Sequence, residues 1–161
     1  MKELLDKLSS YNLFNYLLPG TIFVAAAQRI STHTFKDENI VVELFLYYFI
    51  GLVISRIGSL TIEPAMKKTK FVKFAPYKDF VNACAKDAKV ELLSEQNNTY
   101  RTLCAVFLAL GALKLYDIAA GWWPRTARGA VLVILFGLFA FAYRKQTDYV
   151  RKRVEVAVKK D

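Results

Sequence analysis

Long, unbroken apolar runs constrain the fold of this chain more than any other feature. The run VVELFLYYFIGLVISRIGSLTI, residues 41–62, is by itself long enough to cross a lipid bilayer. Such runs lack the period of two that a barrel strand needs and the broad polar face of a soluble amphipathic helix. Because only helices and closed barrels satisfy their backbone hydrogen bonds in lipid, the sequence predicts an all-α integral membrane bundle.

Four membrane spans are predicted, arranged as two hairpins in a single membrane domain, residues 1–161. The predicted spans are residues 11–30, 40–62, 101–120 and 128–143. A connection of residues 63–100 joins the hairpins, and we expect the last span to stay helical into the tail, residues 144–161. Within the connection, apolar residues at three- and four-residue spacing predict a helix that Pro76 opens and Asn97-Asn98 ends.

The positions of the basic residues predict the orientation. The net charge is +9, and most lysines and arginines lie in the N-terminal segment, the long connection and the tail. The two short connections carry few of them. Because cytoplasmic flanks are enriched in Lys and Arg, both termini are predicted to be cytoplasmic. Trp122 and Trp123 suit the interface belt on the opposite side of the membrane.

The second span carries two ionisable residues, Glu43 and Arg56, which cost free energy in hydrocarbon. At 1.5 Å per residue they lie about 20 Å apart, on roughly opposite helix faces, so they cannot pair with each other. Arg56 is expected to snorkel or pair near the inner leaflet. Glu43 is either an interfacial carboxylate or one member of a carboxylate ring, which would favour cations at the outer mouth of a pore.

Glu43, Tyr47, Gly51 and Ser55 are the pore candidates on this span. Tyr47 belongs to an aromatic block that either forms a constriction or simply fills space. Gly51 and Ser55, continued by Gly58 or Ser59, form a small-residue seam that permits close helix approach. Such a seam is more often plain helix packing than a gate. We expect this seam and an apolar stripe in the tail to hold a homo-oligomer, with a tetramer favoured.

A helix kink is predicted in the first span at Pro19 and Gly20. Proline has no N–H to bond the carbonyl of Asn15, four residues earlier, so the helix should bend or loosen there.

Five lysines in the connection are candidates for binding a cytoplasmic anion: Lys67, Lys68, Lys70, Lys73 and Lys78. Aromatic residues lie between them, as in proteins that bind single-stranded nucleic acid with little sequence preference. Anionic lipid explains the same pattern. No triad, paired-carboxylate site, phosphate loop or metal-ligand cluster is present, so we expect no enzyme activity and no cofactor or metal.

The four-span layout, the NLFNYLLPG opening (residues 12–20) and the basic connection ending in NNTYR (97–101) resemble small bacterial membrane proteins of antiphage defence. The chain is similar in outline to the Hailong-type channel effector and, second, to the membrane subunit of Kiwa. The first resemblance implies an oligomeric inner-membrane channel that disrupts the membrane potential. Its inhibitor would be a short single-stranded DNA made by a partner nucleotidyltransferase. The second implies a non-conducting sensor or adaptor that recruits a cytoplasmic defence partner.

Overall fold

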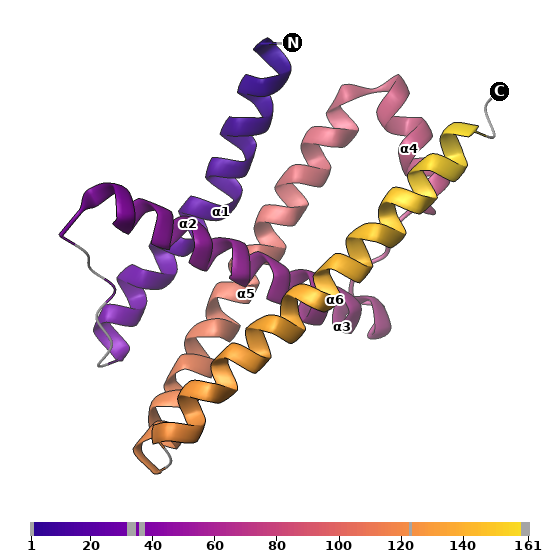
Figure 1. Cartoon of the computed structure of the whole chain (residues 1–161). Coiled ribbons are helices and arrows are strands. Elements are labelled where there is room, and N and C mark those ends of the chain that lie inside the picture. Colours follow the sequence, from indigo (N-terminus) through magenta and orange to yellow (C-terminus); the bar gives the residue numbers. More distant parts are fainter. Residues whose placement is uncertain (1, 32–34, 36–37, 123, 159–161) are drawn as a thin grey trace.

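The computed structural model describes the backbone of residues 2–31, 35, 38–122 and 124–158, and the side chains of residues 15–31, 35, 38–119 and 130–156. This part of the chain is all-helical, as predicted (Figure 1). In chain order the elements are α1 (Lys2–Ile30), α2 (Ile40–Ile57), the π-helix η1 (Gly58–Ile62), α3 (Glu63–Lys68), α4 (Tyr77–Lys86), α5 (Ala88–Trp122) and α6 (Pro124–Val158).

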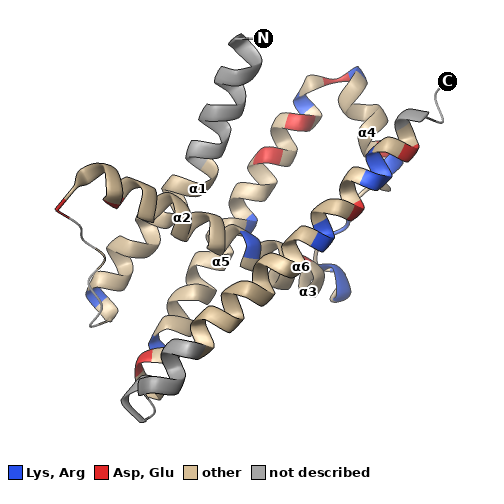
Figure 2. Ribbon diagram, in the orientation of Figure 1, with Lys and Arg blue, Asp and Glu red and all other residues tan. Residues whose placement is uncertain are grey.

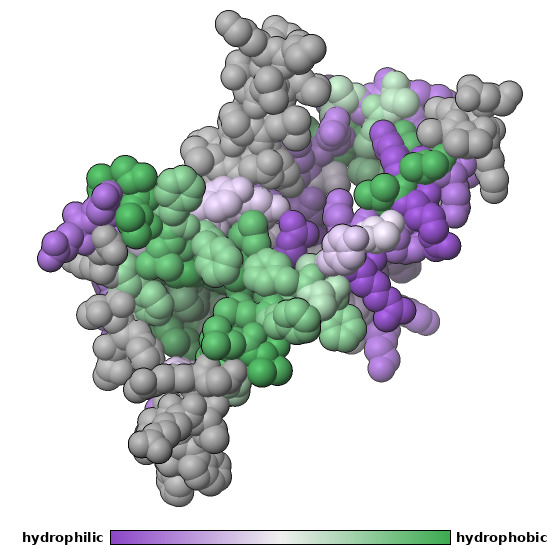
Figure 3. Space-filling model, in the orientation of Figure 1, coloured by the Kyte–Doolittle hydropathy of each residue, from purple (hydrophilic) through white to green (hydrophobic). Residues whose placement is uncertain are grey.

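Three helical stretches in the described part are long and apolar enough to cross a membrane: Ile40–Lys68, Ala88–Ala119 and Ala130–Val156. At most 17% of the apolar window in each is buried within the chain, so most of that surface is left for lipid or for other copies. Figure 3 shows apolar side chains gathered over α2 and the middle of α6. The chain is therefore compatible with a membrane protein. The predicted first span, residues 11–30, is not among these three stretches, and its residues 11–14 lie outside the described side chains. A total of four spans and the two-hairpin arrangement therefore stay predictions.

Local signals explain where several helices begin. α2 begins at Ile40, as predicted, and the Asn39 side chain accepts a hydrogen bond from the Val41 N–H at 2.9 Å. α4 begins directly after Pro76, again as predicted. Asp87 separates α4 from α5 with an extended backbone, and its carboxylate caps α5 by accepting from the Lys89 N–H at 2.9 Å.

Two expectations about helix ends have opposite outcomes. The prediction that Asn97-Asn98 end a helix is wrong, since α5 continues through both to Trp122. The packing of α5 against α1 and α2 outweighs the weak helix propensity of asparagine. The expectation of a helix continuing from the last span into the tail is confirmed, because α6 is unbroken to Val158.

α1 and α2 cross with their backbones in contact. α1 continues through Pro19 and Gly20, so the predicted kink does not end the helix. A Cβ atom built at Gly20 would lie 1.8 Å from the carbonyl oxygen of Tyr47, and one at Gly51 would lie 1.7 Å from that of Tyr16. Only glycine allows helices this close. In Figure 1, α2 crosses α1 and continues toward α5 and α6.

The buried core lies where α1, α2 and α5 meet. Its members are Phe23, Val24, Ala27, Ile54, Ala105 and Val106. α6 packs on α5 and also contacts α2, η1 and α4. Figure 2 shows Lys and Arg concentrated on α3 and on the C-terminal half of α6, and we call this region the basic end of the bundle.

Candidate functional site

A buried carboxylate lies at the basic end of the bundle. Only 7% of Glu63 is exposed, and its carboxylate contacts three cations from three different helices. One oxygen lies 2.7 Å from Nη1 of Arg101 on α5, and the other lies 2.8 Å from Nζ of Lys67 on α3 and 3.3 Å from Nζ of Lys145 on α6. We call these four residues the Glu63 cluster.

Lys145 ties α6 to the π-helix as well as to the carboxylate. Its ammonium donates to the carbonyl oxygen of Ser59 at 2.6 Å and to the Ser59 hydroxyl at 2.9 Å. With Glu63, these acceptors can take all three of the lysine donors. The ammonium also lies 5.8 Å from the centroid of the Tyr149 ring. This one side chain therefore fixes the position of α6 relative to η1.

The π-turn explains how these groups reach one another. The backbone N–H of Glu63 bonds to the carbonyl of Gly58, five residues earlier, which inserts an extra residue into the turn. Such an insertion rotates the following residues relative to a regular α-helix, and π-turns are frequent at functional sites. Gly58 packs tightly on α5, since a Cβ there would lie 3.2 Å from both the Cβ of Ala105 and the carbonyl oxygen of Arg101.

Polar contacts continue from the Glu63 cluster into the core. The fully buried Thr102 donates its hydroxyl to the Asn98 carbonyl at 2.8 Å, and its oxygen lies 3.4 Å from that of Ser55 on α2. Nε of Arg101 is buried and has no hydrogen-bond partner. The cluster therefore joins three cations to one carboxylate, and Glu63 supplies its only negative charge. One donor of Arg101 stays unused.

The structure places Glu43 and Arg56 in separate environments, as their spacing requires. Glu43 is half-buried and accepts a hydrogen bond from the Tyr47 hydroxyl one turn later. Nη2 of Arg56 donates to the hydroxyl of Tyr16 on α1 at 3.3 Å, so Arg56 has a partner on another helix. The ring of Tyr16 also meets that of Tyr48 edge-on, at 5.4 Å between centroids.

The other two pore candidates lie in the interior of the chain. Gly51 is covered by α1, and Ser55, which is 4% exposed, faces Thr102 of α5. Within one chain, both residues are covered by neighbouring helices. The small-residue seam thus serves packing within the chain, and its roles in a pore and in a contact between copies stay predictions.

The candidate anion-binding lysines divide into two groups. Lys67 is engaged by Glu63, and its ammonium lies 4.1 Å from the centroid of the Phe74 ring. The others are exposed: Lys68, Lys70, Lys73 and Lys78. We call all five the lysine patch. Two of its interleaved aromatics, Tyr77 and Phe80, contact each other, and Tyr77 also packs on Tyr149 of α6 at 5.8 Å between centroids.

Sequence reasoning placed Glu63 only at the start of the connection and missed its role. Two signals were present. Glu63 is the sole acidic residue between positions 44 and 78, and Lys67 follows it at the i,i+4 spacing of a helical ion pair. No local pattern identifies Arg101 or Lys145, which come from distant parts of the chain.

Among the described residues, no group of three His, Cys, Asp or Glu side chains could hold a metal ion. Arginine, lysine and one carboxylate are suited to holding helices together or to binding an anion. No family model, no curated protein and no solved structure matches this chain.

Proposed function

We propose that this chain is a membrane effector that assembles from several copies into a channel and disrupts the membrane potential when it opens. The observation that carries the proposal is the buried carboxylate of Glu63, which holds cations from three helices. Ionisable groups buried among membrane helices are costly, and they commonly serve ion pathways or gates.

Several copies are needed because the core of one chain is closed. Gly51 and Ser55 are covered by α1 and α5, whereas most of the apolar helix surface is not buried. A conducting path would therefore run between copies, a tetramer being the favoured assembly. The Glu43–Tyr47 pair lies in the first half of α2 and is only half-buried. Repeated around an axis, Glu43 would supply the carboxylate ring that favours cations at an outer mouth.

The lysine patch supports control by a cytoplasmic anion, such as an oligonucleotide from a partner nucleotidyltransferase. Lys67 belongs both to this patch and to the Glu63 cluster. A polyanion bound to the exposed lysines would compete with Glu63 for Lys67, and would thereby bias the packing of α3 and α6. In this proposal the protein lies in a bacterial inner membrane with both termini cytoplasmic, and it acts in antiphage defence.

Ion flux from liposomes tests the proposal. Wild-type protein should release a cation gradient, and Glu43→Gln should lower the cation flux or the selectivity for cations. Glu43→Lys should block conduction or reverse the preference for cations. Glu38→Gln is the matched control, because Glu38 is exposed and lies just before α2. Equal conduction by wild type and both Glu43 variants would show that Glu43 does not line the pore. Absence of flux from the wild type and all variants would exclude the channel.

A non-conducting adaptor is the second candidate, and exposed apolar residues near the basic end favour it. Phe71 is 79% exposed, and Leu92 and Leu93 on α5 are more than half exposed. These residues lie in the connection predicted to be cytoplasmic, where lipid would not cover them. An adaptor predicts no flux, together with a cytoplasmic partner whose binding is lost on Leu92→Ser and Leu93→Ser.

A further inference from the structure

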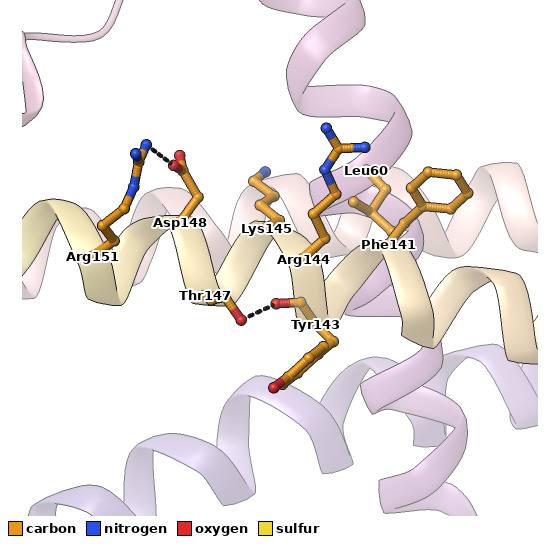
Figure 4. Close-up of a pocket in the computed structure, with 8 residues that line it drawn as sticks. All are labelled: Leu60, Phe141, Tyr143, Arg144, Lys145, Thr147, Asp148 and Arg151. Atoms are coloured by element: carbon orange, nitrogen blue, oxygen red, sulfur yellow. Dashed lines mark hydrogen bonds and ion pairs between the residues drawn. The ribbon is translucent and has the colours of Figure 1, made fainter.

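An open groove runs along one side of α6 at the basic end, with a volume of about 820 Å³. Its apolar part is formed by Phe141, which is 61% exposed, and by Leu60 of η1. Its polar part is formed by Arg144, Asp148 and Arg151, which follow Phe141 at helical spacing. Figure 4 shows these three side chains on one side of α6, in line with Phe141 and Leu60. We call this the Arg144 groove.

Among the described charged side chains of the groove, the guanidinium of Arg144 is the one available to bind a ligand. Lys145 is held by Glu63 and Ser59. Asp148 is neutralised by Arg151 at 2.7 Å and by Lys152 at 2.6 Å, so its carboxylate does not repel an incoming anion strongly. Arg144 is exposed and has no ion pair or hydrogen bond from its side chain in the described part of the chain. Its five donors are thus available for an anion, and a guanidinium matches the geometry of a phosphate.

The groove joins this guanidinium to an apolar surface. It lies where the apolar run of α6 changes to the charged tail, a region where a membrane-spanning helix meets lipid headgroups. A nucleic acid offers phosphate and aromatic bases but no aliphatic chain, whereas a phospholipid offers phosphate together with acyl chains. The neighbouring Phe141 and Leu60 therefore favour a lipid as the occupant.

We propose that the Arg144 groove binds the phosphate of an anionic phospholipid, with Arg144 and the remaining donors of Arg151 on the phosphate and with Phe141 and Leu60 against an acyl chain. This site is separate from the lysine patch and does not depend on whether the protein conducts. It gives α6 a specific lipid contact beside the Glu63 cluster.

Native mass spectrometry of the full chain in uncharged detergent tests the proposal. The probes are phosphatidylglycerol, phosphatidylcholine with the same acyl chains, and inorganic phosphate. Phosphatidylglycerol should bind in preference, and Arg144→Gln should weaken its binding about tenfold, since a charge-assisted contact is lost. Arg153→Gln is the matched control, because it removes an exposed arginine from the same helix outside the groove. Arg144→Lys, which keeps the charge, should weaken binding less than Arg144→Gln.

Circular dichroism checks that each variant keeps its helix content. Equal weakening by Arg144→Gln and Arg153→Gln would overturn the site, because binding would then follow net charge alone. Equal binding of the two lipids would overturn the anionic headgroup. Displacement of phosphatidylglycerol by an equal concentration of inorganic phosphate would overturn the lipid as occupant, since the acyl contact would then contribute nothing.

Discussion

Replacing Gly51 with alanine should destabilise the crossing of α1 and α2. The new methyl carbon would lie 1.7 Å from the carbonyl oxygen of Tyr16 and 2.6 Å from its carbonyl carbon. The nearest approach that real Cβ atoms tolerate is 3.0 Å, so the two helices must separate locally by roughly 1.3 Å. Because the obstructing atoms are backbone, no side-chain rotation relieves the clash. We expect a loss of about 3 kcal/mol in the free energy of unfolding, the upper part of the range for overpacking.

The same substitution at other glycines supplies the controls. Gly111 and Gly137 have no atom within 4 Å of an added Cβ, so alanine there should stabilise its helix by about 0.5–1 kcal/mol. Gly20→Ala should behave like Gly51→Ala, since its Cβ would lie 1.8 Å from the Tyr47 carbonyl oxygen. Reversible unfolding of the detergent-solubilised protein, followed by circular dichroism, measures all four.

The mass of the complex distinguishes this contact from one between copies. If Gly51→Ala unfolds like Gly111→Ala, the close crossing is refuted. If it lowers the mass of the complex while leaving the stability of each chain unchanged, Gly51 lies between copies and the packing described above is wrong.

Two further predictions concern the basic end. Lys70→Gly should raise the free energy of unfolding by about 1 kcal/mol, because Lys70, two residues after the end of α3, has a left-handed φ of 59° that glycine adopts without a Cβ clash. A loss of stability would refute this reasoning. Tyr77→Ala should speed hydrogen exchange in α4, because Tyr77 packs on Tyr149 and its hydroxyl lies 3.5 Å from the Tyr149 carbonyl oxygen. The exposed Phe71→Ala is its control, and equal exchange in both variants would show that Tyr77 does not dock α4.

Local signals in the sequence were enough for the helical class and for some helix ends. The side chain of Asn39 and the fixed backbone of Pro76 act on their immediate neighbours, and both mark helix starts where predicted. The asparagines at 97 and 98 also act locally, but their preference is weak. Packing of the same helix against α1 and α2 outweighed it, and no local pattern reports that packing.

The candidate site was harder to predict because its partners are distant in sequence. The pair Glu63 and Lys67 is readable at four-residue spacing, but Arg101 and Lys145 join it only after α5 and α6 have packed. The small-residue seam shows a different limit. Glycine at position 51 indicates that a backbone comes close, whether that backbone belongs to α1 or to another copy.

Glu63→Gln tests whether the Glu63 cluster holds the helices together. The amide keeps the shape of the carboxylate but leaves Lys67, Arg101 and Lys145 without their shared anion, so unfolding should become easier by about 3–5 kcal/mol. Adding Lys145→Met should recover part of this loss, because one of the unpaired cations is then removed, and the double variant should lose less than the sum of the two single ones. Glu155→Gln makes the same chemical change at an exposed pair on α6, 3.9 Å from Arg151, and should have no measurable effect. Additive losses would mean that Lys145 and Glu63 do not interact energetically. The two groups 3.3 Å apart would then be neighbours without a stabilising interaction, and the proposed control of α6 packing through the Glu63 cluster would lose its basis.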